Sequence, residues 1–357
     1  MDIIKRETNL GALYIDKNTA KMILEHNGNM ITNIKSIMEL FAEKRMPIKV
    51  QFEMTEECNF LCYYCYAKSL KKQKELTTEN IKLMLDKLYD IGIIFLEFTG
   101  GEILTRKDFM EILDYTNKKG FVVSLFTNAS MINEDIINNI KNVYTINTSL
   151  LAPTKERCDE LTGKIGSFDQ IINGINILKR SNINFFVQVT LTNENIDLYY
   201  KFKELENELN VRFVYNIDVG PSFSGFDLVK KYSLKDKDLN CIKELLDKNY
   251  INSMEEFIKC FQCGIGTSKF AIDSEGNILP CMKYRLKLGN IFENDFHEIW
   301  NSDTLKNIMD NELKRPDECN TCNKKEYCIN CPGVYRLYGN SREKCRKAEI
   351  IFNMRNS

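Results

Sequence analysis

The chain has 357 residues, of which 43% are hydrophobic and 28% charged, and its 49 basic and 50 acidic side chains leave a net charge of −1. The apolar share suffices for a buried core, which excludes a wholly disordered chain. The balanced charge excludes a general nucleic-acid binder and a protein held on an anionic membrane surface. The sequence contains no run of 18 apolar residues and no apolar stretch of a secretory signal near its start. We therefore expect no membrane span and a cytoplasmic location.

Cysteine is abundant and histidine is scarce, with 13 cysteines and two histidines. This argues against a His-based catalytic triad and against a His-rich zinc site. Because the cytoplasm keeps thiols reduced, so many cysteines favour several metal centres over a disulfide framework. Three cysteines fall at 58–65 and eight at 260–345, whereas Cys158 and Cys241 stand alone and are interpreted as core residues.

Strand and helix patterns alternate from residue 48 onward. Before that, the first 45 residues contain one predicted strand, at 11–15, and two short predicted helices. The later strands are predicted at 48–54, 93–101, 121–128, 143–151, 184–192 and 211–217. The intervening helices are predicted at 76–92, 107–120, 133–141, 168–181 and 194–209. Thr78 is expected to cap the first of these helices and Gly120 to end the second.

Six strand–helix units predict an α/β fold with a parallel sheet and right-handed crossovers. Six units are fewer than the eight of a complete TIM barrel, so we predict an open, partial (β/α)6 barrel with its functional site at the carboxyl ends of the strands. Beyond residue 260, short elements punctuated by Gly, Pro and Cys predict a small cysteine-rich module that metal stabilises. The predicted divisions are an N-terminal extension at 1–45, the barrel at 46–217, a helical linker at 218–259 with a helix at 239–250, and the cysteine-rich module at 260–350.

The segment after the first barrel strand carries Cys58, Cys62 and Cys65 in a CxxxCxxC spacing. In a barrel this loop lies at the end of the strands where the chemistry occurs. Three thiolates can hold three irons of a 4Fe–4S cluster and leave the fourth iron open for a cofactor or substrate. The alternative is a structural zinc site with a distant fourth ligand, although zinc sites more often pair CxxC knuckles.

With Tyr64 just before the last cysteine, this spacing resembles the signature of the radical S-adenosylmethionine (SAM) enzymes. The second barrel strand ends in Phe-Thr-Gly-Gly-Glu, and its Gly100, Gly101 and Glu102 resemble the GGE motif of that family. Two glycines let the backbone approach a ligand closely, and the carboxylate can accept hydrogen bonds from an α-ammonium group. A GGE alone is an ordinary strand-end turn, but one βα unit after the cysteines it makes the joint resemblance specific.

The resemblance implies that SAM binds the open iron through its methionine amino and carboxylate groups. An electron from the cluster would cleave SAM, and the resulting 5′-deoxyadenosyl radical would abstract a hydrogen atom from the substrate. It further implies that Tyr64 packs near the adenine and that Ser149 contacts the ribose, with an ordinary strand-end hydroxyl as the alternative for Ser149. Asn193 and Asn195, after the fifth barrel strand, could face the cofactor or cap the next helix.

The C-terminal cysteines resemble the SPASM extension of radical SAM enzymes. Cys263 and Cys281 flank Gly276 in a Cys-x12-Gly-x4-Cys segment. The remaining ligands follow as a Cys-x2-Cys-x5-Cys-x2-Cys run and one last cysteine: Cys319, Cys322, Cys328, Cys331 and Cys345. The family usually has three residues between the last two cysteines of the run, whereas this chain has two. A pair of zinc knuckles is the alternative, since CxxC pairs also suit zinc.

Adding Cys260 gives eight thiolates, which is enough for two auxiliary 4Fe–4S clusters beside the SAM-binding one. By resemblance, the first auxiliary cluster is held by Cys260, Cys263, Cys281 and Cys331. The second is held by Cys319, Cys322, Cys328 and Cys345. If Cys260 is not a ligand, one auxiliary iron would be open to a substrate thiolate.

SPASM proteins mostly modify peptides or proteins, so the resemblance implies a maturase of a ribosomally made peptide. It would form a thioether, a carbon–carbon crosslink or an epimerised residue. Its expected partners are a precursor peptide and a flavodoxin- or ferredoxin-type electron donor, with no nucleic-acid or membrane partner. The first 45 residues, part of which resembles a peptide-recognition domain, are either a cap on the barrel or a partial recognition element assisted by a separate recognition protein.

Three alternatives remain open. An anaerobic sulfatase-maturing enzyme oxidises a Cys or Ser to formylglycine and usually has an Asp directly after the cysteine equivalent to Cys281, where this chain has Met282. A tetrapyrrole side-chain modifier would be expected to have more Arg or His to hold propionates. A non-enzymatic metal-binding module would cleave no SAM, and it leaves Glu102 and the open iron unexplained.

Overall fold

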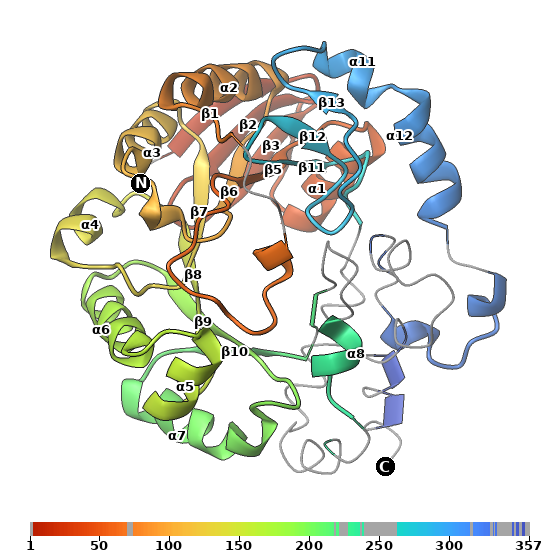
Figure 1. The fold of residues 1–357 in the computed structure, drawn as a ribbon. Helices are drawn as coiled ribbons and strands as arrows, with labels where there is room; N and C mark the ends of the chain where they lie inside the picture. Colours follow the sequence, from red (N-terminus) through yellow and green to blue (C-terminus); the bar gives the residue numbers. More distant parts are fainter. Residues whose placement is uncertain are drawn as a thin grey trace.

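The computed structural model describes residues 3–69, 74–217, 219–220, 228–235, 238, 263–314, 317–328, 331, 333, 345, 348–349 and 352–353 (Figure 1). These residues form a central nine-stranded sheet and a separate four-stranded sheet. The predicted helix at 239–250, Cys241 and Cys260 lie outside the described residues.

Six parallel strands, adjacent in chain order, make up most of the central sheet. They are β5 (Lys49–Glu53), β6 (Phe95–Thr99), β7 (Val122–Thr127), β8 (Thr145–Ser149), β9 (Phe185–Thr190) and β10 (Phe213–Asn216). The helices between them are α2 (Thr78–Ile91), α3 (Phe109–Lys118), α4 (Glu134–Asn139), α5 (Lys155–Thr162), α6 (Ser167–Arg180) and α7 (Tyr199–Leu209). The predicted partial barrel of six βα units is confirmed.

The barrel strands have one apolar and one polar face. On β5, Val50 and Phe52 belong to the buried core that also contains side chains of α2 and α3. Because side chains alternate across a strand, Lys49 and Glu53 lie on the opposite, inner face. There the Lys49 ammonium lies 2.5 Å from the Glu97 carboxylate of β6. The barrel is therefore held by an apolar outer layer and has a charged interior beside β5 and β6.

Two local predictions differ from the structure. The cap of α2 is Thr77, whose side chain accepts from the Asn80 N–H, whereas the Thr78 hydroxyl donates to Asp108. Both threonines can cap, and the helix begins at Thr78, one residue earlier than a cap at Thr78 would allow. The short helix α5 was not predicted, because it has eight residues and a weak apolar stripe. The predicted end of α3 is confirmed, since Gly120 follows it with φ 81°.

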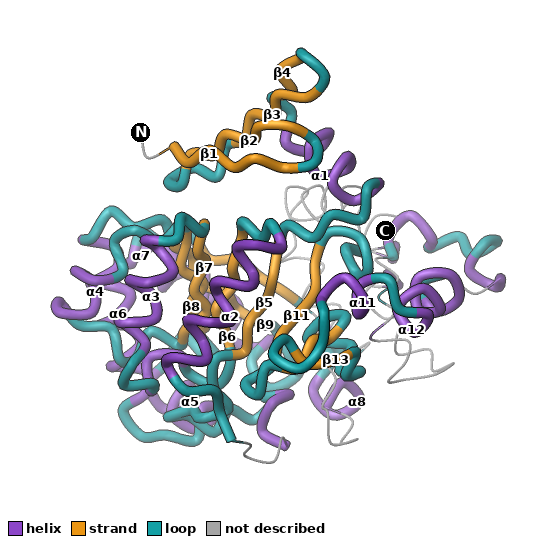
Figure 2. The backbone as a smooth tube through the Cα atoms, turned by 90° about the horizontal axis from the view of Figure 1, so that it is seen from above, coloured by secondary structure: helices purple, strands orange, loops and turns teal. Residues whose placement is uncertain are grey.

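Within its described residues, 3–45, the N-terminal extension contains four strands and one helix. The predicted strand at 11–15 is confirmed, whereas the other three strands were not predicted and the prediction of a second helix was wrong. Its elements are β1 (Ile3–Thr8), β2 (Gly11–Asp16), β3 (Met22–His26), β4 (Asn29–Ile31) and α1 (Ile34–Glu43). The antiparallel sheet forms a layer at one end of the barrel strands (Figure 2). Leu13 and Phe41 pack there with Ile48, Ile94 and Val122, which lie at the amino ends of β5, β6 and β7. The extension thus covers the barrel end opposite the predicted site.

The C-terminal region continues the barrel sheet, which the sequence did not predict. Strand β11 (Lys269–Ile272) pairs in parallel with β5, and β12 (Asn277–Leu279) and β13 (Gly289–Asn290) follow in antiparallel order. The further helices are α8 (Leu228–Tyr232), α11 (Phe296–Trp300), α12 (Asp303–Asn307) and a π-helical turn at Ile308–Glu312. The first half of the cysteine-rich module is therefore built onto the edge of the barrel.

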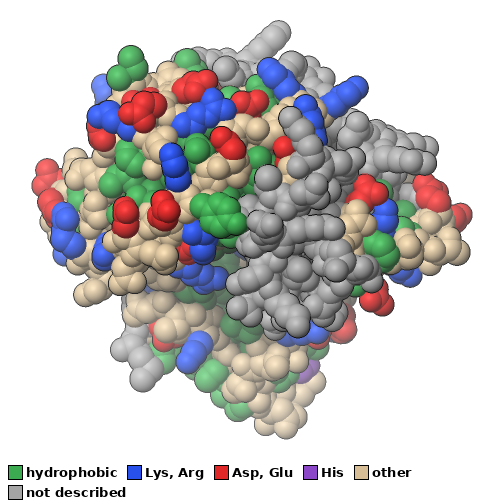
Figure 3. All heavy atoms as spheres, turned by 90° about the horizontal axis from the view of Figure 1, so that it is seen from below, with side chains coloured by type: hydrophobic (Ala, Val, Ile, Leu, Met, Phe, Trp, Pro, Cys, Tyr) green, Lys and Arg blue, Asp and Glu red, His purple; other side chains and the backbone are tan. Residues whose placement is uncertain are grey.

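The described surface agrees with the balanced charge of the sequence. Figure 3 shows Lys, Arg, Asp and Glu side chains interspersed over the described part of the face in view. Within the described ranges, no helix combines the length and the apolar character that crossing a membrane requires.

Candidate cluster and cofactor site

The predicted ligands Cys58, Cys62 and Cys65 lie on the connection between β5 and α2, here called the cysteine loop (residues 54–76). The loop starts at the carboxyl end of β5 and reaches towards β9 across the sheet (Figure 1). It is anchored there by α5, since the Leu61 and Tyr63 N–H groups donate to carbonyls at the end of that helix. The loop therefore lies over the carboxyl ends of the barrel strands, as predicted.

The three thiols of the cysteine loop lie close enough to influence one another's ionisation. Cys58 is exposed, and Cys62 and Cys65 are partly buried. Burial raises the pKa of both Cys58 and Cys62, and the neighbouring Cys65 raises the pKa of each further. Three thiolates this close repel each other unless a cation offsets their charge. The donor set therefore fits a group that binds several thiolates and supplies positive charge, as an iron–sulfur cluster does.

A site for a single metal ion would differ from a cluster site, because its ligands would all have to converge on one point. In the part of the chain that the structure describes, no three His, Cys, Asp or Glu side chains converge on a point where one metal ion could be held. The ligands of a 4Fe–4S cluster each bind a different iron, so they do not converge on one point.

The glycines of the GGE segment make room for the cysteine loop itself. A Cβ on Gly100, which has φ 142°, would lie 2.3 Å from the Thr55 carbonyl oxygen. A Cβ on Gly101 would lie 2.1 Å from the Glu57 carbonyl oxygen. In place of side chains, the Gly101 and Glu102 N–H groups donate to those same two carbonyls, each at 2.8 Å. The close approach expected towards a ligand is thus observed towards the backbone that leads into Cys58.

Glu102 is fully buried and joins the carboxyl ends of β6 and β7. Its carboxylate accepts from the Thr127 hydroxyl at 2.7 Å, the Asn128 N–H at 2.6 Å and the Leu104 N–H at 3.1 Å. Burial raises the pKa of Glu102, and these three donors oppose that effect. The predicted contact with the SAM ammonium group stays a prediction. The structure shows that the carboxylate also links the ends of β6 and β7 through hydrogen bonds.

The tyrosines of the cysteine loop fix its far side. Tyr64, the residue expected near the adenine, is partly buried with its ring against that of Tyr63, and burial raises its pKa while a hydrogen bond from Thr190 opposes this. The Tyr63 hydroxyl lies 2.5 Å from the Thr192 hydroxyl, and its ring packs on Tyr232. Both side chains therefore point to the end of β9, across the sheet from the GGE segment.

The other residues expected to contact SAM lie at the ends of β8 and β9. Ser149 is the last residue of β8 and is partly buried. The Asn193 side-chain amide donates to the Lys231 carbonyl, and among the described residues its buried Oδ1 has no partner. Asn195 is fully buried, and its amide donates to the Leu151 and Thr190 carbonyls, so it ties β8 to β9. Ser149 and Asn193 remain predicted SAM contacts, and Asn195 has a structural role.

Three cysteines of the predicted first auxiliary set come together. Burial raises the pKa of Cys263 and of Cys281, and proximity to Cys331 raises the pKa of both. The remaining described cysteines of the module are partly buried or exposed: Cys319, Cys322, Cys328 and Cys345. Cys158 is fully buried in α5. The division of the ligands between two clusters stays a prediction.

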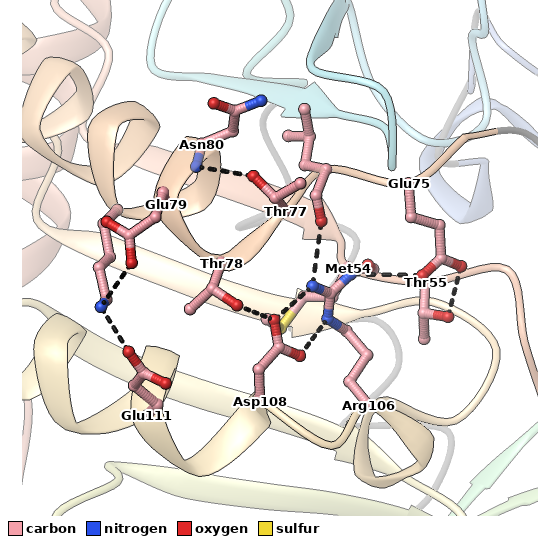
Figure 4. A network of polar contacts seen from close by, with 12 residues as sticks. Met54, Thr55, Glu75, Thr77, Thr78, Glu79, Asn80, Arg106, Asp108 and Glu111 are labelled. Atoms are coloured by element: carbon pink, nitrogen blue, oxygen red, sulfur yellow. Dashed lines mark hydrogen bonds and ion pairs between the residues drawn. The ribbon is translucent and has the colours of Figure 1, made fainter.

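Three ion pairs made by two largely buried arginines at this end of the barrel were not predicted. The Arg106 side chain, 9% exposed, joins Glu75 of the cysteine loop to Asp108 before α3 (Figure 4). The Arg285 guanidinium lies 2.7 Å from the Glu53 carboxylate, which is 1% exposed. Burial raises the pKa of Glu53 and the Arg285 charge opposes this. These residues carry no spacing signal, because their partners lie far away in the sequence.

Comparison with known proteins agrees with this geometry. A family model described as the radical SAM superfamily matches residues 52–205, which include the cysteine loop and the GGE segment. A second model, SPASM, described as an iron–sulfur cluster-binding domain, matches residues 263–323. The chain belongs to the radical SAM superfamily and carries a SPASM domain. It is therefore a radical SAM enzyme.

Curated relatives of this radical SAM enzyme have different activities. The AdoMet-dependent heme synthase of Methanosarcina barkeri is 26% identical over 82% of this chain and 93% of its own length. The antilisterial bacteriocin subtilosin biosynthesis protein AlbA of Bacillus subtilis is 27% identical over 85% of this chain and 70% of its own. A cysteine-type anaerobic sulfatase-maturating enzyme of Clostridium novyi is 28% identical over 77% of this chain and 84% of its own.

A solved structure shows the same fold. Streptococcus suis SuiB bound to S-adenosylmethionine superposes with a TM-score of 0.69 at 17% identity, over 96% of this chain and 97% of SuiB. The shared fold covers the barrel and the SPASM domain together.

Proposed function

We propose that this radical SAM/SPASM enzyme modifies a peptide, forming a thioether, a carbon–carbon crosslink or an epimerised residue. The relatives that support a peptide substrate are AlbA, a bacteriocin biosynthesis protein, and SuiB, whose structure has also been solved with its precursor peptide SuiA. The observation that carries the proposal is the pairing of β11 with β5. It sets the hairpin between Cys263 and Cys281 beside the strand that leads into the cysteine loop, so that one continuous sheet carries both proposed cluster sites.

The roles of the chain's own residues follow from their positions. Cys58, Cys62 and Cys65 would hold a 4Fe–4S cluster with SAM, which when bound supplies a 5′-deoxyadenosyl radical that removes hydrogen from the substrate. Gly100 and Gly101 hold the start of the cysteine loop against β6. The loop lies over the carboxyl ends of the strands and so holds the proposed cluster site there.

We further propose three clusters, two of them held by the eight C-terminal cysteines, and a flavodoxin- or ferredoxin-type electron donor. The proposed division keeps 1–45 as a cap, 46–217 as the barrel, 218–259 as a linker and 260–350 as the SPASM domain. A cap is favoured over a peptide-recognition element, because the extension packs against the amino ends of the strands, at the opposite end from the cysteine loop.

Two structural observations disfavour the alternative substrates. A tetrapyrrole with propionate groups needs cations, yet Lys49 and Arg285 on the inner side of the barrel are already paired with Glu97 and Glu53. A formylglycine-forming enzyme would be expected to have a carboxylate after Cys281, whereas Met282 is buried there and cannot accept a proton.

The test is anaerobic co-expression with each short open reading frame encoded beside the gene, followed by intact peptide mass. A crosslink removes two hydrogen atoms, so the peptide mass falls by about 2 Da per site. Epimerisation leaves the mass unchanged in water but incorporates deuterium at an α-carbon in heavy water. The Cys62→Ala variant is the control and should leave the peptide unmodified. A wild-type preparation that cleaves SAM but changes no peptide in either way contradicts the proposal.

A further inference from the structure

The polar network at the base of the cysteine loop centres on Arg106 (Figure 4). Its guanidinium makes five hydrogen bonds, which matches the number of N–H donors it has. Two go to the Asp108 carboxylate at 2.8 and 3.1 Å and one to the Glu75 carboxylate at 3.3 Å. The other two go to the backbone carbonyls of Met54 at 3.0 Å and Leu76 at 3.1 Å.

These partners are the two ends of the cysteine loop. Met54 is the residue after β5, and Leu76 lies two residues before α2. Glu75 strengthens the link, because its carboxylate also accepts from the Thr55 hydroxyl at 2.6 Å and the Glu56 N–H at 2.9 Å. Arg106 and Glu75 together therefore join the start of the loop to its end.

We infer that Arg106 is a positioning residue that holds the two ends of the cysteine loop together and thereby sets the position of Cys58, Cys62 and Cys65 for SAM binding. This inference rests on the proposed cluster site. Cys58, Cys62 and Cys65 all lie between the two joined ends, and holding the ends of a long connection together reduces the number of conformations open to it. The planar fork of Arg can meet two carboxylates and two carbonyls at once, which the single ammonium of Lys cannot.

A nearby ion pair provides a matched control. Lys82 on α2 lies 2.5 Å from Glu111 on α3 and 3.2 Å from Glu79 on α2. It therefore links α2 to α3, and among the described residues its ion pairs include none of the cysteine loop. The pair is exposed on the Glu111 side, with 58% of that side chain accessible. Removing the Lys82–Glu111 ion pair tests whether the loss of any contact between α2 and α3 weakens SAM binding, or only the loss of the Arg106 contacts.

The test uses the anaerobically reconstituted holoenzyme and four variants, Arg106→Met, Arg106→Lys, Glu75→Gln and Lys82→Met. The readouts are the SAM concentration that gives half of the SAM-induced change in the EPR spectrum of the reduced cluster, and hydrogen exchange in peptides covering 54–76 without SAM. The EPR change reports on the cluster with an open iron, and neither readout needs a peptide substrate.

We expect Arg106→Met to raise the SAM concentration at half of the EPR change about tenfold or more, because the three cysteines would no longer be held in one position. Hydrogen exchange at both ends of the cysteine loop should become faster. Glu75→Gln keeps its shape but loses the charge and the oxygen that accepts from Arg106, so it should fold and show a smaller shift in the same direction. Arg106→Lys should restore little, and Lys82→Met should stay within about twofold of the wild type.

The inference is overturned if Arg106→Met and Glu75→Gln both bind SAM within twofold of the wild type, whatever their thermal stability. It is also overturned if Lys82→Met shifts SAM binding as much as Arg106→Met. Should Arg106→Met fail to fold, Glu75→Gln alone decides between these outcomes. A wild-type enzyme with a SAM-dependent spectrum that modifies no peptide would contradict the proposed function and leave this inference standing.

Discussion

Glu102 shows that a residue marked for cofactor binding can also belong to the protein's internal framework. Its buried carboxylate accepts hydrogen bonds from three donors, and it thereby links the ends of β6 and β7 in the interior. A carboxylate in this position satisfies all three donors, and a neutral amide cannot, because its NH2 group would face another N–H. The motif therefore sets the shape of the site as well as its chemistry.

The Glu102→Gln variant should lose stability even without SAM. One buried donor would be left unsatisfied, which costs about 1–3 kcal/mol. Urea unfolding of the reconstituted protein without SAM measures this difference in the free energy of unfolding. An unchanged free energy of unfolding, with weaker SAM binding alone, would show that Glu102 acts only towards the cofactor.

The Glu53–Arg285 pair makes a second prediction, which depends on pH. Burial raises the pKa of Glu53 and Arg285 opposes this, so Arg285→Met should raise the pKa further. A carboxyl whose folded-state pKa is raised stabilises the fold below its ordinary pKa, and this stability is lost as the pH rises through the raised value. Breaking a buried pair costs about 3–5 kcal/mol, so the variant should lose up to that much at pH 8 and clearly less at pH 5.5. An equal loss at both pH values would contradict a buried, charged Glu53.

At the scale of residues, the sequence predicts the cysteines as ligands but gives no indication of Arg106 and Arg285. Cysteine spacing is a local signal that can be read without the fold. Arg106 contacts residues 30 or more positions away, apart from Asp108, and Arg285 contacts Glu53 from 232 positions away. Only the fold brings such partners together.

At the scale of elements, the GGE segment and the cysteine loop act as one unit. The N–H groups of Gly101 and Glu102, which follow β6, donate to two carbonyls of the loop. Because the glycines carry no side chain, the two backbones lie in direct contact. A side chain at Gly101 would have to displace the Glu57 carbonyl, which lies in rigid backbone rather than at the end of a flexible side chain. The position of the cysteine loop therefore depends on the position of the carboxyl end of β6.

Gly101→Ala should accordingly destabilise the protein by about 1–3 kcal/mol and lower its iron content after reconstitution. Gly220→Ala is a suitable control, because the nearest atom to its added Cβ is 4.0 Å away. Unfolding in urea and iron analysis of both variants test this. If Gly101→Ala kept full iron and stability, the close approach would not matter for the loop.

The elements that local pattern determines were predicted, and those that depend on distant pairing were not. Each βα unit of the barrel is read within one stretch of sequence, so all six appeared in the prediction. The hairpin of β3 and β4 does have a local signal, the Asn27–Gly28 pair, which the prediction did not use. Asn-Gly favours the positive φ angles that a two-residue hairpin turn requires, and both residues have them. Strand β11 pairs with β5 across 269 − 49 = 220 positions, and no local pattern announces that.

At the scale of the whole molecule, the barrel and the SPASM domain share one sheet. The turn between β11 and β12 also contacts the cysteine loop, since the Ser274 carbonyl accepts from the Leu76 N–H at 2.9 Å and its hydroxyl donates to Glu56 at 3.3 Å. The N-terminal sheet closes the opposite end of the barrel. The proposed cluster sites of the barrel and of the SPASM domain thus belong to one continuous scaffold, with the cysteine loop at the carboxyl ends of the strands.

The measurement that tests the account most directly is the yield of 5′-deoxyadenosine from SAM under strictly anaerobic reduction, for the wild type and for Cys62→Ala. The account predicts formation of 5′-deoxyadenosine by the reconstituted wild type and its abolition in Cys62→Ala, because a cluster with two of its three thiolates cannot present an open iron to SAM. Equal yields from the two proteins would contradict the assignment of the cysteine loop as the cluster site.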